Sequence, residues 1–371
     1  MTPALTLTSS RSLATALAFA FAGLMTLLEA YAFLAAAGID PVEAFHNMYV
    51  AALGSKFAVG TSLGKTVPRL LCALGIALAI RGGLWNIGAE GQIYLGAAGA
   101  AGVAMFAPGI AGIHGPMVGL FAGCLIGAAW GAIPGALRAY RGINEVITSL
   151  LLVYVAIQLV NYLVEGPWLV PNSTFPATAV LPASERLSRI WPGTLLNAGF
   201  PVALGMTLAA HVVLFKTEFG LWIRSIGGNE RASYVMGLPV RFMLVTVMAL
   251  SGAFAGLAGA IEVLGTRGRL VEGFSPGYGF EAIAIALLGR LHPVGIACAA
   301  LIFGILDAGS GGLQVSSAGM SAAISPIIEG LAVVNLLASL RLVEIALKHH
   351  SARKALADRR RSEAPTMLRE A

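Results

Sequence analysis

Residues 115–137 read GPMVGLFAGCLIGAAWGAIPGAL, a stretch that decides the class of fold. It is apolar and long enough to cross a bilayer as a helix, which takes about 20 residues. Glycine recurs at every fourth position, so that one helix face carries no side chains and a second backbone can approach it closely. The glycines are Gly119, Gly123, Gly127, Gly131 and Gly135. The stretch predicts a membrane helix packed against another helix, and shorter small-residue runs around Gly96 and Gly252 predict the same.

The composition of the whole chain agrees with a membrane protein. Of its 371 residues, 57% are hydrophobic and 11% are charged, whereas soluble domains carry about 25% charged residues. The net charge of +6 is spread over short loops and a terminal tail. Because nucleic-acid binding needs a basic face, we expect no nucleic-acid partner.

The sequence shows no set of residues suited to catalysis or metal binding. The three cysteines and six histidines are scattered among separate segments, so neither a disulfide nor a metal site is predicted. Residues 59–66 (VGTSLGKT) nearly match the phosphate-binding motif GxxxxGKS/T, but Val59 replaces its first glycine and no buried strand precedes it. We therefore expect a non-catalytic chain that binds no metal or cofactor itself.

The apolar segments predict an all-α polytopic membrane protein with about ten spans. Their expected positions are 13–37, 61–81, 91–108, 115–137, 146–164, 200–216, 240–264, 281–292, 294–310 and 322–345. The segment 281–292 is short for a span, and Arg290, His292 and Pro293 make a tight break after it. We expect this segment to be tilted, broken or only partly inserted.

Basic residues orient these spans. With a cytoplasmic N-terminus, most of the 24 lysines and arginines fall in inside segments, as the positive-inside rule requires. The remainder fall in outside segments, namely Lys56, Lys65, Arg69, Arg186, Arg189, Arg267 and Arg269. Both termini are then cytoplasmic. The expected parts are an N-terminus (1–12), a transmembrane domain (13–345) with an outer loop (165–199) and a cytoplasmic loop (216–239), and a basic cytoplasmic tail (346–371).

A polar stretch between the second and third spans cannot continue a lipid-facing helix. Residues 83–92 read GLWNIGAEGQ, with an Asn, a Glu, a Gln and three glycines. We call this stretch the signature loop. It must be buried backbone or a loop that faces water or a partner. Helix capping by Asn86 and Glu90 would explain the residue types, though not the whole string.

The signature loop closely resembles the GLxNIGAEGQ motif of permease subunits of bacterial ABC importers. These belong to the branched-chain amino acid, ribose and galactose permease superfamily, and the resemblance is to its nucleoside and simple-sugar branch. It rests on Asn86, Gly88, Glu90, Gly91 and Gln92, and also on Asn144 and Glu145 in GINEVI (142–147). The loop 219–239 and the stretch YGFEAIAIALLG (278–289) match the same branch. The resemblance runs from about residue 15 to 345.

The resemblance implies a type II ABC importer permease, with about ten helices built as two inverted halves. It implies a multi-pass protein of the bacterial plasma (inner) membrane. The expected partners are a second related permease, a cytoplasmic ATPase that binds the ATP, an extracytoplasmic substrate-binding lipoprotein and membrane lipid. Arg231 and Ser233 depart from the usual pattern, in which proline and alanine are commoner.

The cytoplasmic loop 216–239 makes physical sense as a coupling segment, the part that contacts the ATPase. Gly227 and Gly228 would allow a sharp turn, and Asn229 or Glu230 would cap a short helix. The residues expected to couple are Arg224, Gly227, Gly228, Asn229, Glu230, Ala232 and Gly237. An ordinary charged loop is the alternative.

Acidic residues within the later spans are candidates for the translocation path. They are Glu262, Glu281, Asp307 and Glu329. A carboxylate in a membrane span is costly, so each should face a polar cavity, a basic partner or a helix end. Carboxylates can accept the hydroxyls of a ribose or hexose, but helix capping or pairing with Arg267 or Arg269 would explain them equally well.

Two functions follow from these observations. The first is a permease subunit of an ABC importer for nucleosides or a related sugar-type solute, with the solute chosen largely by the binding protein. The second is an independent secondary transporter whose acidic residues carry protons.

Overall fold

The computed structural model describes residues 3–107, 115–171 and 175–316, and single residues between 327 and 345. It divides into two compact units. One comprises Met1–His46 with Gly319–Ala371, and the other comprises Asn47–Ala318. Among the described residues the chain is helical, and its β pairing is limited to isolated bridges such as Ala177 with Val271.

The helices follow the expected spans closely. They are α1 (Pro3–Ala36), α2 (Pro41–Leu53), α3 (Lys56–Arg81), α4 (Ala89–Phe106), α5 (Gly115–Arg141), α6 (Glu145–Glu165), α7 (Gly199–Lys216), α8 (Glu218–Gly228), α9 (Glu230–Val235), α10 (Val240–Ile261), which continues as a π-helical turn η3 (Glu262–Arg267), α11 (Tyr278–Leu288) and α12 (Pro293–Ser316), with a short 3-10 turn η2 at Ala183–Glu185. The expected tenth span, 322–345, and the tail 346–371 lie mostly or wholly outside the described residues.

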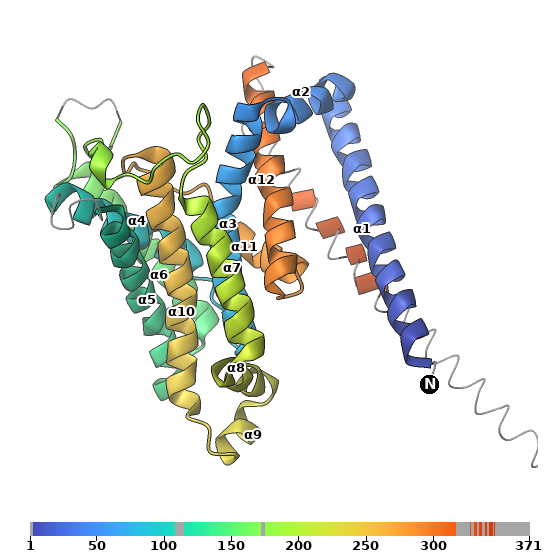
Figure 1. The fold of residues 1–371 in the computed structure, drawn as a ribbon, viewed down its shortest axis with the longest axis vertical. Coiled ribbons are helices and arrows are strands. Elements are labelled where there is room, and N and C mark those ends of the chain that lie inside the picture. The colour runs from blue at the N-terminus through green and yellow to red at the C-terminus, as the bar shows by residue number, and fades with distance from the viewer. Residues whose placement is uncertain are drawn as a thin grey trace, which may run out of the picture. The chain divides into compact units, whose positions relative to one another are not determined.

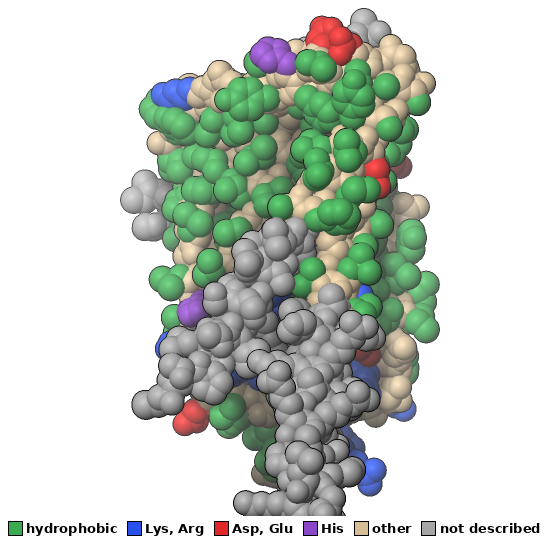
Figure 2. All heavy atoms as spheres, turned by 90° about the vertical axis from the view of Figure 1, so that its right-hand side faces the viewer, with side chains coloured by type: hydrophobic (Ala, Val, Ile, Leu, Met, Phe, Trp, Pro, Cys, Tyr) green, Lys and Arg blue, Asp and Glu red, His purple; other side chains and the backbone are tan. Residues whose placement is uncertain are grey.

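Six of these helices are long and apolar enough to cross a membrane. They are α3, α5, α6, α7, α10 with η3, and α12. The bent pair Ala20–Ala36 and Pro41–Leu53 raises the number to seven if it counts as one span. Hydrophobic side chains cover most of the described surface in Figure 2, as lipid contact requires. The protein is therefore an all-α, multi-pass membrane protein.

The glycine face of α5 packs directly against α10, as its spacing predicts. A Cβ at Gly127 would overlap the carbonyl oxygen of Gly252 and would lie 2.7 Å from the Cα of Gly256. One turn away, a Cβ at Gly123 would lie 2.6 Å from the Cβ of Ala260. The glycines of α4 join this contact, because a Cβ at Gly96 would overlap the backbone of Gly256. Side-chain-free faces thus bring the backbones of α4, α5 and α10 together within the larger unit.

The outer loop between α6 and α7 is held to the segment that follows η3. The amide of Thr178 donates to the carbonyl of Leu270 at 2.9 Å, and that of Leu181 donates to Gly268 at 2.8 Å. This loop lies at one end of the larger unit, and α9 lies at the other (Figure 1). Residues 268–277 are not helical, but Leu270 and Phe274 are fully buried. Irregular backbone inside a membrane protein is tolerated when protein covers it in this way.

Helix α11 is half a span. Its 11 residues correspond to about 16 Å, roughly half the thickness of the hydrocarbon core. Its first turn lies beside the start of α4, and the turn after it reaches the end of α3, where Arg81 Nε donates to the carbonyl of Leu291 at 2.7 Å. Arg290 and Leu291 adopt left-handed φ angles of 53° and 56° in that turn. The expected short helix and the break after it are therefore present, and a tilted, broken or only partly inserted segment stays the prediction.

The smaller unit has a polar contact on α1. The side-chain amide of Asn335 donates to Glu29 at 2.6 Å and to the hydroxyl of Thr26 at 3.2 Å. Polar side chains join membrane helices in this manner because hydrocarbon offers them no other partner. Glu29 is therefore paired inside its own unit.

Helix α3 is longer than the span expected at 61–81. Lys65 and Arg69 were assigned to an outside segment, and the structure places both within α3, which begins at Lys56. Arg69 is a buried residue in the body of this helix, with 1% of its side chain exposed. The helix starts earlier because Ser55 caps it, its hydroxyl accepting from the amide of Ala58 at 3.0 Å.

Candidate functional site

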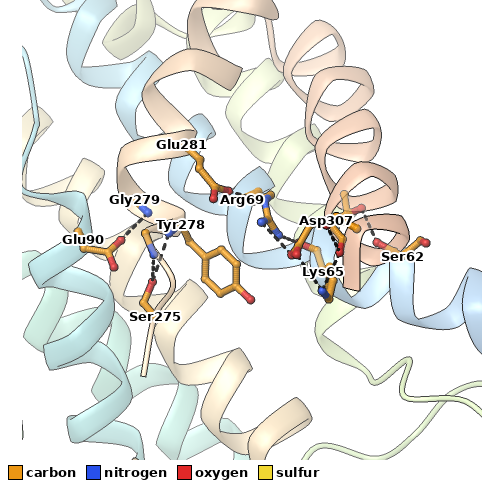
Figure 3. A network of polar contacts seen from close by, with 12 residues as sticks. Ser62, Lys65, Arg69, Glu90, Ser275, Tyr278, Gly279, Glu281 and Asp307 are labelled. Carbon is orange, nitrogen blue, oxygen red and sulfur yellow. Dashed lines mark hydrogen bonds and ion pairs between the residues drawn. The ribbon is translucent and has the colours of Figure 1, made fainter. Parts of the chain in front are cut away.

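A charged cluster lies among α3, α11 and α12, and Arg69 is its centre. Arg69 Nε lies 2.7 Å from Glu281 Oε2, and Arg69 Nη2 lies 2.9 Å from Asp307 Oδ2. Lys65 Nζ lies 2.9 Å from the other oxygen of Asp307. Figure 3 shows the four side chains converging from the three helices. We call Lys65, Arg69, Glu281 and Asp307 the charged cluster.

The charges of this cluster balance. Two cations face two carboxylates, and the ring of Tyr278 covers Arg69 with its centroid 4.6 Å from the guanidinium carbon. Pairing and cation–π contact offset the cost of removing Arg69 from water. The two carboxylates keep 24% and 20% of their side chains exposed, and Lys65 keeps 31%. The cluster therefore has a buried side at Arg69 and an accessible side at its carboxylates.

The structure brings together two of the four acidic residues that we expected on a path. Glu281 and Asp307 share Arg69. Glu262 instead pairs with Arg267 at 3.3 Å, which is the alternative raised for it from the sequence. Glu329 lies outside the described residues.

Sequence reasoning missed Lys65, Arg69 and Tyr278 as members of this site. A signal for the two cations was present, because they stand four residues apart in an otherwise apolar span and so share one helix face. Two basic residues on one face of a membrane helix require anionic partners. The sequence did not show that the partners follow more than 200 residues later.

The signature loop is a buried, hydrogen-bonded turn between α3 and α4. The Asn86 side-chain amide donates to Gln92 Oε1 at 2.9 Å and to the hydroxyl of Ser251 on α10 at 2.8 Å. Its carbonyl oxygen accepts from the amide of Gly88 at 3.0 Å. Asn86 and Gln92 are each 1% exposed. These bonds satisfy the polar groups that the sequence placed among apolar spans.

The coupling segment folds as two short helices. The hydroxyl of Thr217 accepts from the amide of Gly220 and caps α8, and the side chain of Asn229 accepts from the amide of Ala232 at 2.9 Å and caps α9. The expected cap at Asn229 is therefore confirmed. Gly227 and Gly228 belong to the last turn of α8, so the expectation that they form the sharp turn is wrong; Asn229, with extended backbone, separates the helices. Gly237 follows α9 at φ 84°.

One surface of α9 faces away from the rest of the unit. Tyr234, Val235 and Met236 are each at least 68% exposed, and Ala232 is exposed beside them. Helix α9 stands at the end of the unit opposite the outer loop (Figure 1). An exposed apolar surface on a short rigid helix is a usual feature of a protein contact.

The coupling segment is in direct contact with the signature loop. A Cβ at Gly227 would overlap the carbonyl oxygen of Arg81 and would lie 2.9 Å from the amide nitrogen of Gly83. Glycine is therefore required on both sides, since Gly83 also has a φ of 79°. The end of α8 is thus seated on the turn that opens the signature loop.

A second connection uses charged side chains. Arg138, near the end of α5, lies 3.1 Å from Glu230 on α9 and 3.4 Å from Glu145 at the start of α6. Glu145 in turn accepts from the amide of Trp85 at 3.4 Å. Asn144 caps α6 and so fixes Glu145 at its first turn. Asn144 and Glu145 therefore connect the coupling segment to the signature loop.

Phe215, at the end of α7, forms a third connection. Its ring lies 5.0 Å from the guanidinium carbon of Arg81, 5.5 Å from that of Arg224 and 5.3 Å from the ring of His292. Partial burial, with His211 and Arg81 nearby, lowers the pKa of His292. Arg224 of the coupling segment is thereby joined to the turn between α11 and α12.

Comparison with known proteins agrees with this architecture. Residues 58–337 match the family described as the branched-chain amino acid transport system / permease component. The chain is 38% identical to the glucose ABC transporter permease protein of Haloferax volcanii, across 82% of this chain and 83% of that protein. It is 34% identical to the guanosine ABC transporter permease protein of Bacillus subtilis (78% and 84%) and 30% identical to a nucleoside ABC transporter permease protein of Lactococcus lactis (86% and 89%). No solved structure matches the chain. The chain belongs to this permease family, and it is a permease subunit of an ABC transporter.

Proposed function

We propose that this permease imports nucleosides or a related sugar-type solute, and that the charged cluster lies on the path of that solute. Relatives that cover most of this chain are named for glucose, guanosine and nucleosides. These solutes share neighbouring hydroxyl groups on a sugar ring. The proposed solute class is therefore one that carries a sugar ring.

The observation that supports a path at the cluster is its partial exposure. Glu281 and Asp307 remain about one-quarter to one-fifth exposed although both lie in or near membrane helices. A carboxylate held by Arg69 on one side has free lone pairs on the other, and those accept hydroxyl hydrogen bonds. Lys65 adds a donor at the accessible edge. Neutral sugars suit such a charge-balanced lining, because they bring no net charge of their own.

The remaining parts of the proposal follow from the family. The exposed surface of α9 contacts a cytoplasmic ATPase, and α8 carries ATPase closure to the signature loop as a rigid-body movement. Arg224, Gly227, Gly228, Asn229, Glu230, Ala232 and Gly237 make up this coupling segment. A second permease subunit and a substrate-binding lipoprotein outside complete the complex in a bacterial plasma membrane. With α9 cytoplasmic, both termini are cytoplasmic, and the spans form ten helices in two inverted halves.

The test uses the complex encoded with this gene, reconstituted in proteoliposomes with its binding protein. We expect ATP-dependent uptake of a labelled nucleoside or hexose that persists when a protonophore is added. Uptake that needs a proton gradient and no ATP would instead establish the secondary transporter.

A matched pair of variants tests the path. Asp307→Asn keeps the shape of the side chain and removes its charge, and we expect it to lower the maximal uptake rate. Glu165→Gln, at the exposed end of α6, makes the same kind of change away from the cluster and should transport normally. Unchanged uptake in Asp307→Asn at normal abundance would remove the cluster from the path.

A further inference from the structure

A buried carboxylate in the signature loop takes part in neither the proposed path nor the contact with the coupling segment. Glu90 is 2% exposed and lies in the first turn of α4. Its Oε2 accepts a hydrogen bond from the backbone amide of Gly279 at 2.7 Å, at the start of α11 (Figure 3). An ionisable side chain buried inside a membrane protein is costly, so its presence calls for a physical reason.

The first turns of α4 and α11 meet backbone to backbone at this point. A Cβ at Gly279 would lie 2.6 Å from the Cα of Glu90 and 2.8 Å from the carbonyl carbon of Ala89, and would overlap the amide nitrogen of Glu90. Gly279 therefore has no room for a side chain. Two motifs that looked independent in the sequence, GLWNIGAEGQ and YGFEAIAIALLG, pack on each other through this glycine.

This arrangement places two helix N-termini side by side. Each N-terminus carries a partial positive charge and amide groups without helical acceptors. Glu90 supplies a negative charge between the N-termini of α4 and α11, and it accepts a hydrogen bond from one of the free amides, that of Gly279. The hydroxyl of Ser275 accepts from two more, those of Gly277 and Tyr278, each at 3.3 Å. A neutral amide at position 90 could accept the same hydrogen bond, but it would not offset the two dipoles.

We propose that the Glu90 carboxylate joins α4 and α11 into one moving body. The start of α4 continues from the signature loop, on which the coupling segment is seated through Gly227. Helix α11 carries Glu281, which holds Arg69 of the charged cluster. Glu90 is thus a positioning residue, which transmits movement of the coupling segment to the cluster through α11. This proposal rests on the functions proposed above for the coupling segment and the charged cluster.

The first experiment measures the joint itself, without any solute. Hydrogen–deuterium exchange is followed in the purified complex for peptides that cover residues 276–284. Glu90→Gln should speed exchange there by about tenfold, because a hydrogen bond to a carboxylate is about twice as strong as one to a neutral amide, and losing that difference raises the equilibrium for opening the bond by about that factor. Glu165→Gln is the control and should change nothing in this region. Unchanged exchange in Glu90→Gln would overturn the proposal.

The second experiment measures the consequence for transport. In proteoliposomes, Glu90→Gln should reduce solute moved per ATP hydrolysed by about tenfold, while hydrolysis continues. Gly279→Ala disturbs the same joint from the side of α11, keeps the charge of Glu90, and should give the same loss.

The two experiments separate two kinds of failure. Faster exchange with unchanged transport per ATP would overturn the role of the joint in coupling and leave the permease function standing. No ATP-dependent uptake by the unmodified complex would refute the proposed function, whereas the exchange result would still decide whether Glu90 holds the two helices together.

Discussion

Adding one methyl group to a glycine should have opposite effects on two membrane helices of this protein. At Gly127 on α5, a Cβ would overlap the carbonyl oxygen of Gly252 and lie 2.7 Å from the Cα of Gly256. At Gly205 on α7, a Cβ would meet nothing within 4 Å. Gly127→Ala and Gly205→Ala therefore make the same chemical change in helices of similar apolar character. Gly127 faces the backbone of another helix, and Gly205 does not.

The magnitudes follow from these contacts. Ordinary van der Waals contact begins near 3.4 Å, and the Cα of Gly256 lies 2.7 Å from the added methyl group, so α5 and α10 must separate by at least about 0.7 Å to admit it. A gap of that size forfeits about a quarter to a half of the dispersion energy along the contact, and overpacking of this kind costs about 1–3 kcal/mol. At Gly205, alanine loses less backbone entropy than glycine when the helix forms, and this favours the helix by up to about 1 kcal/mol.

The assay is heat treatment in detergent followed by size-exclusion chromatography of the fluorescently tagged protein. Gly127→Ala should lower the midpoint of thermal loss by at least about 2 °C, and Gly205→Ala should leave it unchanged or raise it. Equal midpoints for both variants would refute the argument that α5 and α10 touch through their backbones.

Three further predictions concern the charged cluster, the coupling segment and the topology. Arg69→Met should cost up to about 3–5 kcal/mol, because it leaves two half-buried carboxylates with Lys65 alone. Adding Glu281→Gln should restore part of the abundance measured by immunoblot, and a further loss would contradict the pairing. Gly228→Leu should insert normally, since a Cβ there meets nothing within 4 Å, but it should lose uptake because its side chain blocks the proposed contact with the ATPase. Gly227→Leu should instead lower abundance, because its Cβ would overlap the carbonyl oxygen of Arg81. Normal uptake by Gly228→Leu would contradict the ATPase contact. In a background without native cysteines, Val180→Cys should react with an impermeant thiol reagent on intact cells and Met236→Cys only after permeabilisation. Labelling of Met236→Cys on intact cells would contradict the proposed orientation.

The parts of the fold that depend on local pattern could be predicted from the sequence. The glycines of α5 repeat every fourth residue, and a repeat of that period leaves only one arrangement, a bare face against another backbone. Asn229 was identifiable as a cap because a short polar side chain before a helix has few other roles. The short length of residues 281–292 indicated a segment that is tilted, broken or only partly inserted, because a straight span needs more residues to cross the bilayer.

The parts that depend on distant partners could not be predicted. Lys65 and Arg69 looked like the charged edge of a span, because the carboxylates that allow them inside the bundle lie on α11 and α12. Glu90 could be assigned to a motif but not to a contact, since Gly279 is 189 residues away. A charge-based topology rule treats every basic residue as solvated and therefore cannot identify a basic residue that is buried by pairing with carboxylates.

The half-length of α11 has a consequence for biogenesis. The 11 residues of α11 are too few to form a span, which takes about 17 or more, and Glu281 makes insertion of the segment still less favourable. We therefore expect helix α11 to enter the bilayer together with α12, as a hairpin closed by residues 289–292. Two partners of α11 belong to helices that are synthesised earlier. Arg69 on α3 pairs with Glu281, and Glu90 on α4 accepts from the amide of Gly279. The amino-terminal half of this chain thus acts as an intramolecular template for insertion, and a carboxy-terminal half made alone would leave α11 outside the membrane.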